Sequence, residues 1–159
     1  MPTVKIHVIA VGKLKEKFWV EACAEYMKRL KSYAKVSVSE VPDRDPAKCG
    51  GEEGARKAEG KAILEALPDH SHVILLDVGG KQLSSEGIAA RMDALMLSGV
   101  SDITFVVGGS GGVSANVKDF ADECLSFGKI TLPHNLARVV LLEQIYRAFK
   151  ISRGEPYHK

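Results

Sequence analysis

The chain lacks several residue patterns on which whole classes of protein depend. Its three cysteines, Cys23, Cys49 and Cys124, are odd in number and widely spaced, with no Cys-x-x-Cys pair among them. This argues against both a disulfide framework and a structural zinc site. The five histidines form no metal-binding pattern either, so we expect no metal. We expect a reducing, cytoplasmic setting.

Long apolar runs and a strong charge of one sign are also missing. No segment approaches the roughly twenty apolar residues that a membrane helix needs, and the N-terminus lacks the pattern of a signal peptide. The formal net charge is only +2 over 159 residues, so the whole-molecule field gives no strong attraction for a polyanion. We therefore expect no membrane partner.

Three common catalytic or nucleotide-binding templates fail. The glycine cluster at 108–112 follows an apolar run, but the dinucleotide template G-x-G-x-x-G needs glycine at position 114, which is Ser114. No phosphate-loop sequence is present. No G-x-S-x-G elbow surrounds a serine. Dinucleotide, nucleoside-triphosphate and serine-hydrolase chemistry are therefore disfavoured.

Apolar segments and amphipathic segments alternate along the chain. We expect a single α/β domain over 1–159, with a mostly parallel sheet flanked by helices. The expected strands are 4–11, 36–41, 73–78, 103–107 and a strand-like 125–132. The expected helices are 15–33, 53–67, 84–97 with serine caps at its start, 114–122, and a terminal helix after 132.

Two glycine-rich segments, 79–80 and 108–112, come directly after expected strands. Open α/β sheets bind ligands where parallel strands end, and glycine allows backbone to approach a ligand closely. The two segments together predict a binding groove. Tight turns without a binding role are the alternative.

The C-terminal stretch is basic and partly aromatic. From position 134 onward, five cations stand against two anions. The terminal helix has a broad apolar arc, which fits either a core helix with solvated ion pairs or a homodimer interface. Glu143 and Arg147 are spaced to pair across one turn.

Four ordered motifs make the chain recognisable. They are L-L-D-V-G-G-K-Q-L-S-S-E-G at 75–87, F-V-V-G-G-S-G-G at 105–112, L-P-H at 132–134 and R-G-E-P-Y-H-K at 153–159. An opening V-G-K-L-K at 11–15 accompanies them. Together they resemble the RlmH family, bacterial SPOUT-class methyltransferases that act on ribosomal RNA.

The resemblance implies a SPOUT-type fold with a deep C-terminal trefoil knot, an exception to the usual absence of knots, and a homodimer. It implies S-adenosyl-L-methionine as the cofactor. The implied cofactor contacts are Leu76, Gly108, Phe127, Gly128, Lys129, Ile130, Thr131 and Leu132.

The implied reaction is methylation of N3 of a pseudouridine in 23S ribosomal RNA within the assembled ribosome. The residues expected to take part in catalysis are Tyr157, His158, Arg147 and Glu143. Those expected to bind RNA are Arg138, Arg147, Arg153 and Lys159. The proton acceptor remains open among them. A ribosome-associated RNA-binding or assembly factor without catalysis and a SPOUT methyltransferase acting on transfer RNA are the alternatives.

Overall fold

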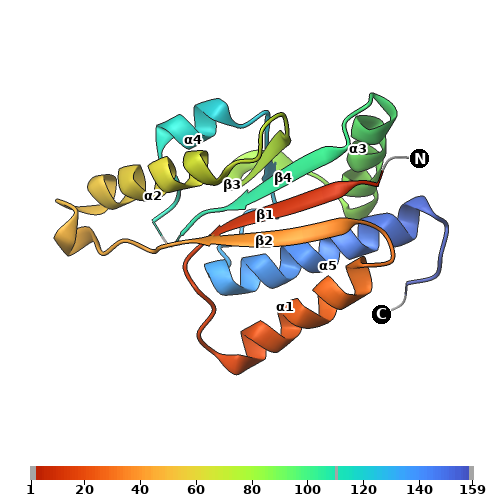
Figure 1. Ribbon diagram of the computed structural model, residues 1–159, viewed down its shortest axis with the longest axis horizontal. Coiled ribbons are helices and arrows are strands. Elements are labelled where there is room, and N and C mark those ends of the chain that lie inside the picture. The colour runs from red at the N-terminus through yellow and green to blue at the C-terminus, as the bar shows by residue number, and fades with distance from the viewer. Residues whose placement is uncertain (1–2, 110, 158–159) are drawn as a thin grey trace.

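Parallel strands form a sheet at the centre of the molecule (Figure 1). The computed structural model describes residues 3–109 and 111–157. Within them the sheet has five strands in the order β2-β1-β4-β3-β5. The strands are β1 (Lys5–Val11), β2 (Lys35–Val41), β3 (His72–Gln82), β4 (Asp102–Val107) and β5 (Glu123–Ser126). All of their pairings are parallel, so their carboxyl ends meet at one edge.

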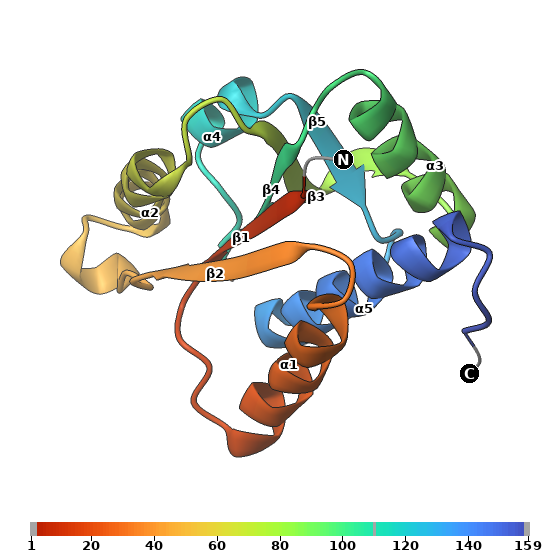
Figure 2. The same ribbon diagram turned by 45° about the vertical axis from the view of Figure 1, so that its right-hand side comes forward.

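Helices cover both faces of this sheet, as Figure 2 shows. The longer helices are α1 (Lys17–Leu30), α2 (Glu52–Ala66), α3 (Ser85–Leu97) and α5 (His134–Ser152). The chain also contains a short helix, α4 (Ala115–Phe120), and a 3₁₀ turn, η1 (Pro46–Lys48). One face carries α1, α3 and α5, and the other carries α2 and α4. No helix in the described residues is long and apolar enough to cross a membrane.

The two faces bury two separate apolar clusters. Successive strand residues point to opposite faces, so Phe105 of β4 joins the cluster under α1, α3 and α5, whereas Val106 joins the cluster under α2. Both side chains are almost fully buried. Because both faces are covered, the central strands read as continuous apolar runs rather than alternating ones.

The expected strand at 125–132 is wrong in both bounds. β5 begins earlier, at Glu123, and ends at Ser126, and the residues after it form a loop. Gly128 has a φ of 120°, a left-handed conformation that a β-strand does not continue. The Ser126 hydroxyl accepts from the Gly128 amide at 3.1 Å and donates to its carbonyl at 3.0 Å. These local bonds replace strand pairing.

The strand expected at 73–78 is longer than predicted. β3 continues to Gln82, with an irregular register between Leu76 and Lys81, after which it pairs again with β5. Gly80 lies in this continuation, so close to β5 that a Cβ atom there would stand 2.7 Å from the Cys124 carbonyl carbon. Only glycine allows the two backbones to come this close. The segment 79–80 therefore lies within a continued strand, and it is not a tight turn.

The terminal helix, α5, is covered by its own chain along much of its apolar arc. Leu141, Leu142, Ile145, Ala148 and Phe149 are buried, with α1 and α3 packed against the helix. The core interpretation therefore accounts for these side chains. The expected serine cap is also confirmed, because the Gly87 amide donates to the Ser84 hydroxyl at 3.0 Å.

Candidate cofactor site

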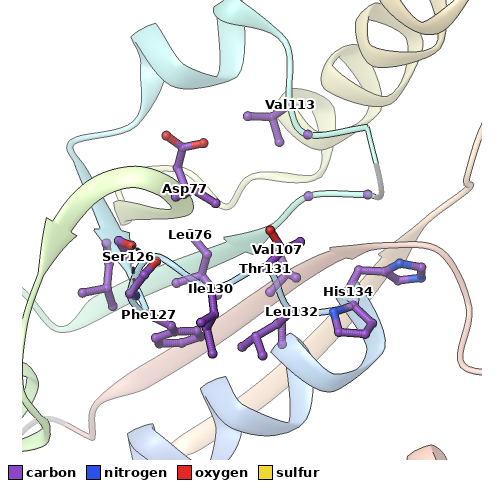
Figure 3. Close-up of a pocket in the computed structure, with 18 residues that line it drawn as sticks. Leu76, Asp77, Val107, Val113, Ser126, Phe127, Ile130, Thr131, Leu132 and His134 are labelled. Carbon is purple, nitrogen blue, oxygen red and sulfur yellow. Dashed lines mark hydrogen bonds between the residues drawn. The ribbon is translucent and has the colours of Figure 1, made fainter.

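A cavity of about 510 Å³ lies where β3, β4 and β5 end. It is bounded by the irregular part of β3, the glycine segment after β4, the loop after β5 and the first turn of α5. Figure 3 shows the labelled side chains arranged around this hollow, with His134 at one edge. Its lining consists of Leu76, Asp77, Val78, Val107, Gly108, Gly109, Gly112, Val113, Leu125, Ser126, Phe127, Gly128, Ile130, Thr131, Leu132, Pro133, His134 and Ala137.

The structure brings together most of the residues predicted to contact a cofactor. Seven of the eight line the cavity, namely Leu76, Gly108, Phe127, Gly128, Ile130, Thr131 and Leu132. Lys129 is exposed and does not line it. Motifs distant in sequence therefore converge on one place, although their binding of a cofactor remains a prediction.

Glycines shape the wall that follows β4. A Cβ atom on Gly108 would stand 2.7 Å from a methyl carbon of Val113, so any larger residue would displace that side chain. The Gly112 amide donates to the Gly109 carbonyl at 3.0 Å and closes a tight turn. Gly112 itself has a φ of 82°, which favours glycine.

The lining suits a ligand with an apolar ring and a positive charge. Most of its side chains are aliphatic, and a cavity of this volume can enclose a molecule of drug-like size. Asp77 adds a carboxylate, whose Oδ2 atom accepts from the Gly79 amide at 3.2 Å. An adenosine group carrying a sulfonium fits this combination of apolar wall, exposed backbone and single carboxylate.

Arg138, which is expected to bind RNA, is buried against the ends of β1 and β2. Its side chain is 3% exposed, and its guanidinium donates to the Glu40 carboxylate at 2.7 Å and to the Gly12 carbonyl at 2.9 Å. Through these two hydrogen bonds, Arg138 holds the end of β2 and the loop after β1 against α5. Its guanidinium is thus bonded within the chain, and its contact with an RNA phosphate stays a prediction.

The predicted catalytic residues that the structure describes form a cluster away from the cavity. Arg147 donates to Glu143 from Nε at 3.0 Å and from Nη2 at 2.6 Å, which confirms the expected pair. The Arg147 guanidinium lies 4.3 Å from the centre of the Tyr157 ring, a cation–π distance. The Tyr157 ring also meets Tyr146 edge-on, with centroids 5.0 Å apart.

Titration in this cluster follows from these contacts. Burial alone would raise the pKa of Glu143, but hydrogen bonds from Arg147 and Tyr157 outweigh it and lower the pKa. Burial raises the pKa of Tyr157, and its hydrogen bonds to Glu143 and Tyr26 raise it further. At neutral pH the cluster therefore contains an ionised carboxylate and a neutral phenol.

The remaining tail residues are only partly described. The Arg153 guanidinium lies 4.6 Å from the centre of the Tyr33 ring, and its residue is exposed. His158 and Lys159 lie outside the described residues. α5 has 19 residues, which at about 1.5 Å each places its C-terminal end about 28 Å from the cavity edge at His134. Arg147, on which the Tyr157 ring packs, lies about 20 Å from that edge.

The sequence interpretation missed some polar residues at the cavity. Asp77 and His134 lie inside the motifs that carry the family resemblance, at 75–87 and 132–134. Their position in those motifs could have identified them as cavity residues. Glu59 was also missed. It is 6% exposed and lies against Gly109, but nothing in a helix pattern marks one of several glutamates as buried.

Comparison with known proteins agrees with this architecture. The family model described as "Predicted SPOUT methyltransferase" matches residues 4–158. The chain is 51% identical over 157 residues to a Listeria welshimeri protein named Ribosomal RNA large subunit methyltransferase H, with 97% of the chain and 99% of the relative aligned. A Bacillus cytotoxicus protein of the same name is 53% identical over the same coverage.

Solved structures share the fold at low identity. A tRNA (m1G37) methyltransferase from Aquifex aeolicus superposes with a TM-score of 0.57 at 16% identity, covering 99% of this chain and 75% of that one. A probable methylase from Haemophilus influenzae gives 0.59 at 16% identity, covering 98% and 70%. With its parallel sheet, its cavity at the strand ends and a family match along nearly its whole length, the chain belongs to the SPOUT methyltransferase family.

Proposed function

We propose that this protein transfers a methyl group from S-adenosyl-L-methionine to N3 of a pseudouridine in 23S ribosomal RNA. The observation that carries the proposal is the cavity of about 510 Å³, in which seven predicted cofactor contacts meet. The relatives that share half of the sequence over its length are named for methylation of large-subunit ribosomal RNA. Their near-complete coverage supports the same substrate here.

The cavity residues divide the work of holding the cofactor. Apolar side chains such as Leu76, Ile130 and Leu132 would enclose the adenine, and the backbone beside Gly108 and Gly128 would bond its polar edge. The Asp77 carboxylate would attract the positive end of the molecule. When bound, the cofactor supplies a methyl group on a positively charged sulfur, so the protein must align the acceptor nitrogen, exclude water and accept a proton.

Two chains are needed for this arrangement. Along α5, Arg147, on which the Tyr157 ring packs, lies about 20 Å from the cavity edge at His134, and Arg153 lies about 28 Å from it. A homodimer could place the tail of one chain at the cavity of the other, where cations and rings would hold RNA. Passage of the C-terminal segment through the loops around the cavity, the trefoil knot of the family, would fix α5 in position. We place the reaction in the cytoplasm, on the assembled ribosome.

Filling the cavity tests the proposal. Thr131 lines the cavity and is exposed, so Thr131→Trp should block the cofactor without disturbing the core. Lys129→Trp is the matched control, because Lys129 lies on the same loop outside the lining. We expect calorimetry to show S-adenosylmethionine binding to wild type and to the control, and at least about tenfold weaker binding to Thr131→Trp.

Wild type, Thr131→Trp and Lys129→Trp should then be incubated with ribosomes and with transfer RNA from a strain that lacks the gene for this protein. We expect mass spectrometry of nuclease digests to find one methylated pseudouridine in 23S RNA, made by wild type and control. Cofactor binding without methylation of either RNA would favour the assembly-factor alternative. Methylation of transfer RNA alone would favour the alternative of a methyltransferase that acts on transfer RNA.

A further inference from the structure

A continuous group of aromatic rings joins the C-terminal half of α1 to the tail beyond α5. The Tyr146 ring of α5 lies at its centre, with its centroid 5.0 Å from that of Tyr157. The centroids of Tyr33 and Tyr26 lie 5.9 Å and 6.3 Å from it. Tyr33, which follows α1, also stacks on Phe149 with centroids 5.6 Å apart. The rings therefore reach from Tyr157, which the family resemblance places in the reaction, to α1, for which the resemblance implies no role.

Positively charged side chains lie against these tyrosines. The Arg29 guanidinium of α1 is 5.3 Å from the centre of the Tyr26 ring. The Lys150 ammonium is 5.5 Å from the centre of the Tyr33 ring, and the Arg153 guanidinium is 4.6 Å from it. A cation that packs on a ring keeps its N–H donors for other partners. These contacts therefore orient the cations and leave their charge available.

We call this surface the α1–α5 basic face, and it consists of Tyr26, Arg29, Tyr33, Tyr146, Lys150 and Arg153. Two carboxylates accompany it. Glu25 pairs with Arg29 at 2.7 Å, and Glu155 accepts from the Tyr33 hydroxyl at 2.9 Å. Within residues 3–109 and 111–157, the other two cations of the face form no ion pair. The end of α1 and the residues after it add the exposed Lys28, Lys31 and Lys35. This end of the molecule thus has more cations than carboxylates.

A solvated helix surface is the ordinary explanation for exposed cations. It does not account for cations that are set on a connected row of rings. Proteins bind the RNA backbone with Lys and Arg, and they hold unpaired bases on aromatic rings and guanidinium planes. A membrane is a poorer match, because the tyrosines of the face are half-buried and a lipid-binding helix presents bulky apolar side chains to insert.

We propose that the α1–α5 basic face binds the RNA that carries the target pseudouridine, with Arg29 and Lys150 on its phosphates. The Arg153 guanidinium, which lies over the Tyr33 ring, adds a plane on which an unpaired base can stack. This inference rests on the proposed function, and it makes α1 a second RNA-binding element beside the tail. Because Tyr157 belongs to the same group of rings, the face holds RNA next to the residue that the resemblance places in the reaction.

Two double variants that each remove two positive charges test this. Arg29→Gln combined with Lys150→Gln changes the α1–α5 basic face. Lys57→Gln combined with Lys61→Gln changes α2, on the opposite side of the sheet (Figure 2), and is the control. The control is matched, because Lys57 pairs with Glu53 one turn earlier on its helix, as Arg29 does on α1. Both variants have the same net charge, so a difference between them reports the position of the charges.

Binding to ribosomes from a strain that lacks the gene for this protein should be measured without cofactor at several salt concentrations. In Arg29→Gln/Lys150→Gln we expect Kd to rise by at least about fivefold. The slope of log Kd against log salt concentration should fall by about one to two, because two phosphate contacts are lost. The control and the charge-preserving pair Arg29→Lys/Lys150→Arg should stay within about twofold of wild type.

Equal dissociation constants and equal salt slopes for the two double variants would overturn the proposal. Weaker binding accompanied by loss of the dimer in analytical ultracentrifugation would also overturn it, because the face would then lie between chains. So would unchanged RNA binding together with lost binding to vesicles of anionic phospholipid. If wild type binds ribosomes through this face but methylates no pseudouridine, the proposed function fails and the RNA contact stands.

Discussion

At the scale of single residues, Arg138 holds together segments that border the cavity. It joins α5 to Glu40 and to the Gly12 carbonyl, and Gly12 lies beside His134. Arg138→Leu should lower the free energy of unfolding by about 2–3 kcal/mol, because it strands a carbonyl and a half-buried carboxylate. Urea denaturation followed by circular dichroism measures this loss.

Arg138→Lys is the control for that prediction. It keeps the charge and one donor, so its loss of stability should be smaller than that of Arg138→Leu. A stability unchanged by Arg138→Leu, together with weaker binding of ribosomal RNA, would contradict the buried role and restore the surface role expected from the sequence.

Charged residues mark the limit of sequence interpretation at this scale. Arg138 and Arg147 both stand on the same helix, yet one is buried against Glu40 and the other pairs with Glu143 one turn away. The second pair follows from i,i+4 spacing, and the structure confirms it. The first joins residues 98 positions apart, and no local pattern contains that information. The burial of Glu59 against Gly109 escaped prediction for the same reason.

At the scale of secondary structure elements, the continuation of β3 depends on Gly80. A Cβ there would meet the Cys124 carbonyl oxygen at 2.8 Å and the Leu125 amide nitrogen at 2.8 Å, and backbone atoms cannot rotate away. Gly80→Ala should therefore destabilise the protein by about 2 kcal/mol or more. It should also weaken cofactor binding, because Leu76, Asp77 and Leu125 line the cavity.

Gly79→Ala is the neighbouring control. A Cβ at that position would meet only the Asp77 Oδ2 atom, at 3.2 Å, the mobile end of a side chain. We expect its stability to stay within about 0.5 kcal/mol of wild type. Equal midpoints of thermal unfolding for Gly79→Ala and Gly80→Ala would show that β3 and β5 separate at no cost there.

Periodicity predicted most elements in the right order, because apolar runs and 3.6-residue patterns report burial directly. It failed at 127–132, where Phe127, Ile130 and Leu132 look like strand residues. These side chains line the cavity instead of pairing in the sheet. Apolar character measures removal from water, and a cavity wall and a strand can share it. The family resemblance, not the periodicity, associated this segment with a cofactor.

At the scale of the whole molecule, the distance along α5 predicts that each active site needs two chains. A dimer can be made from one chain with Thr131→Trp and an intact tail, and another with an open cavity, truncated after Gly154. We expect about half of the wild-type methylation rate, because a single complete site remains. Two different affinity tags allow the mixed dimer to be isolated and assayed on ribosomes.

The two parent homodimers are the controls, and each should be inactive since neither contains a complete site. If the mixed dimer is also inactive while wild-type dimers carrying the same tags are active, the tail works within its own chain. Failure to isolate any mixed dimer after co-expression would contradict the homodimer itself.

The length of α5 is a fixed dimension of this molecule. One end of the helix forms the cavity edge at His134. Arg138 is held one turn later by Glu40 and Gly12, and the Tyr157 ring packs on Tyr146 in the last third of the helix. Each added residue turns everything beyond it by about 100° and moves it by about 1.5 Å. An insertion within α5 would therefore turn the tail in a different direction, whereas surface loops tolerate insertions. Substitutions in this helix should be accepted far more readily than changes in its length.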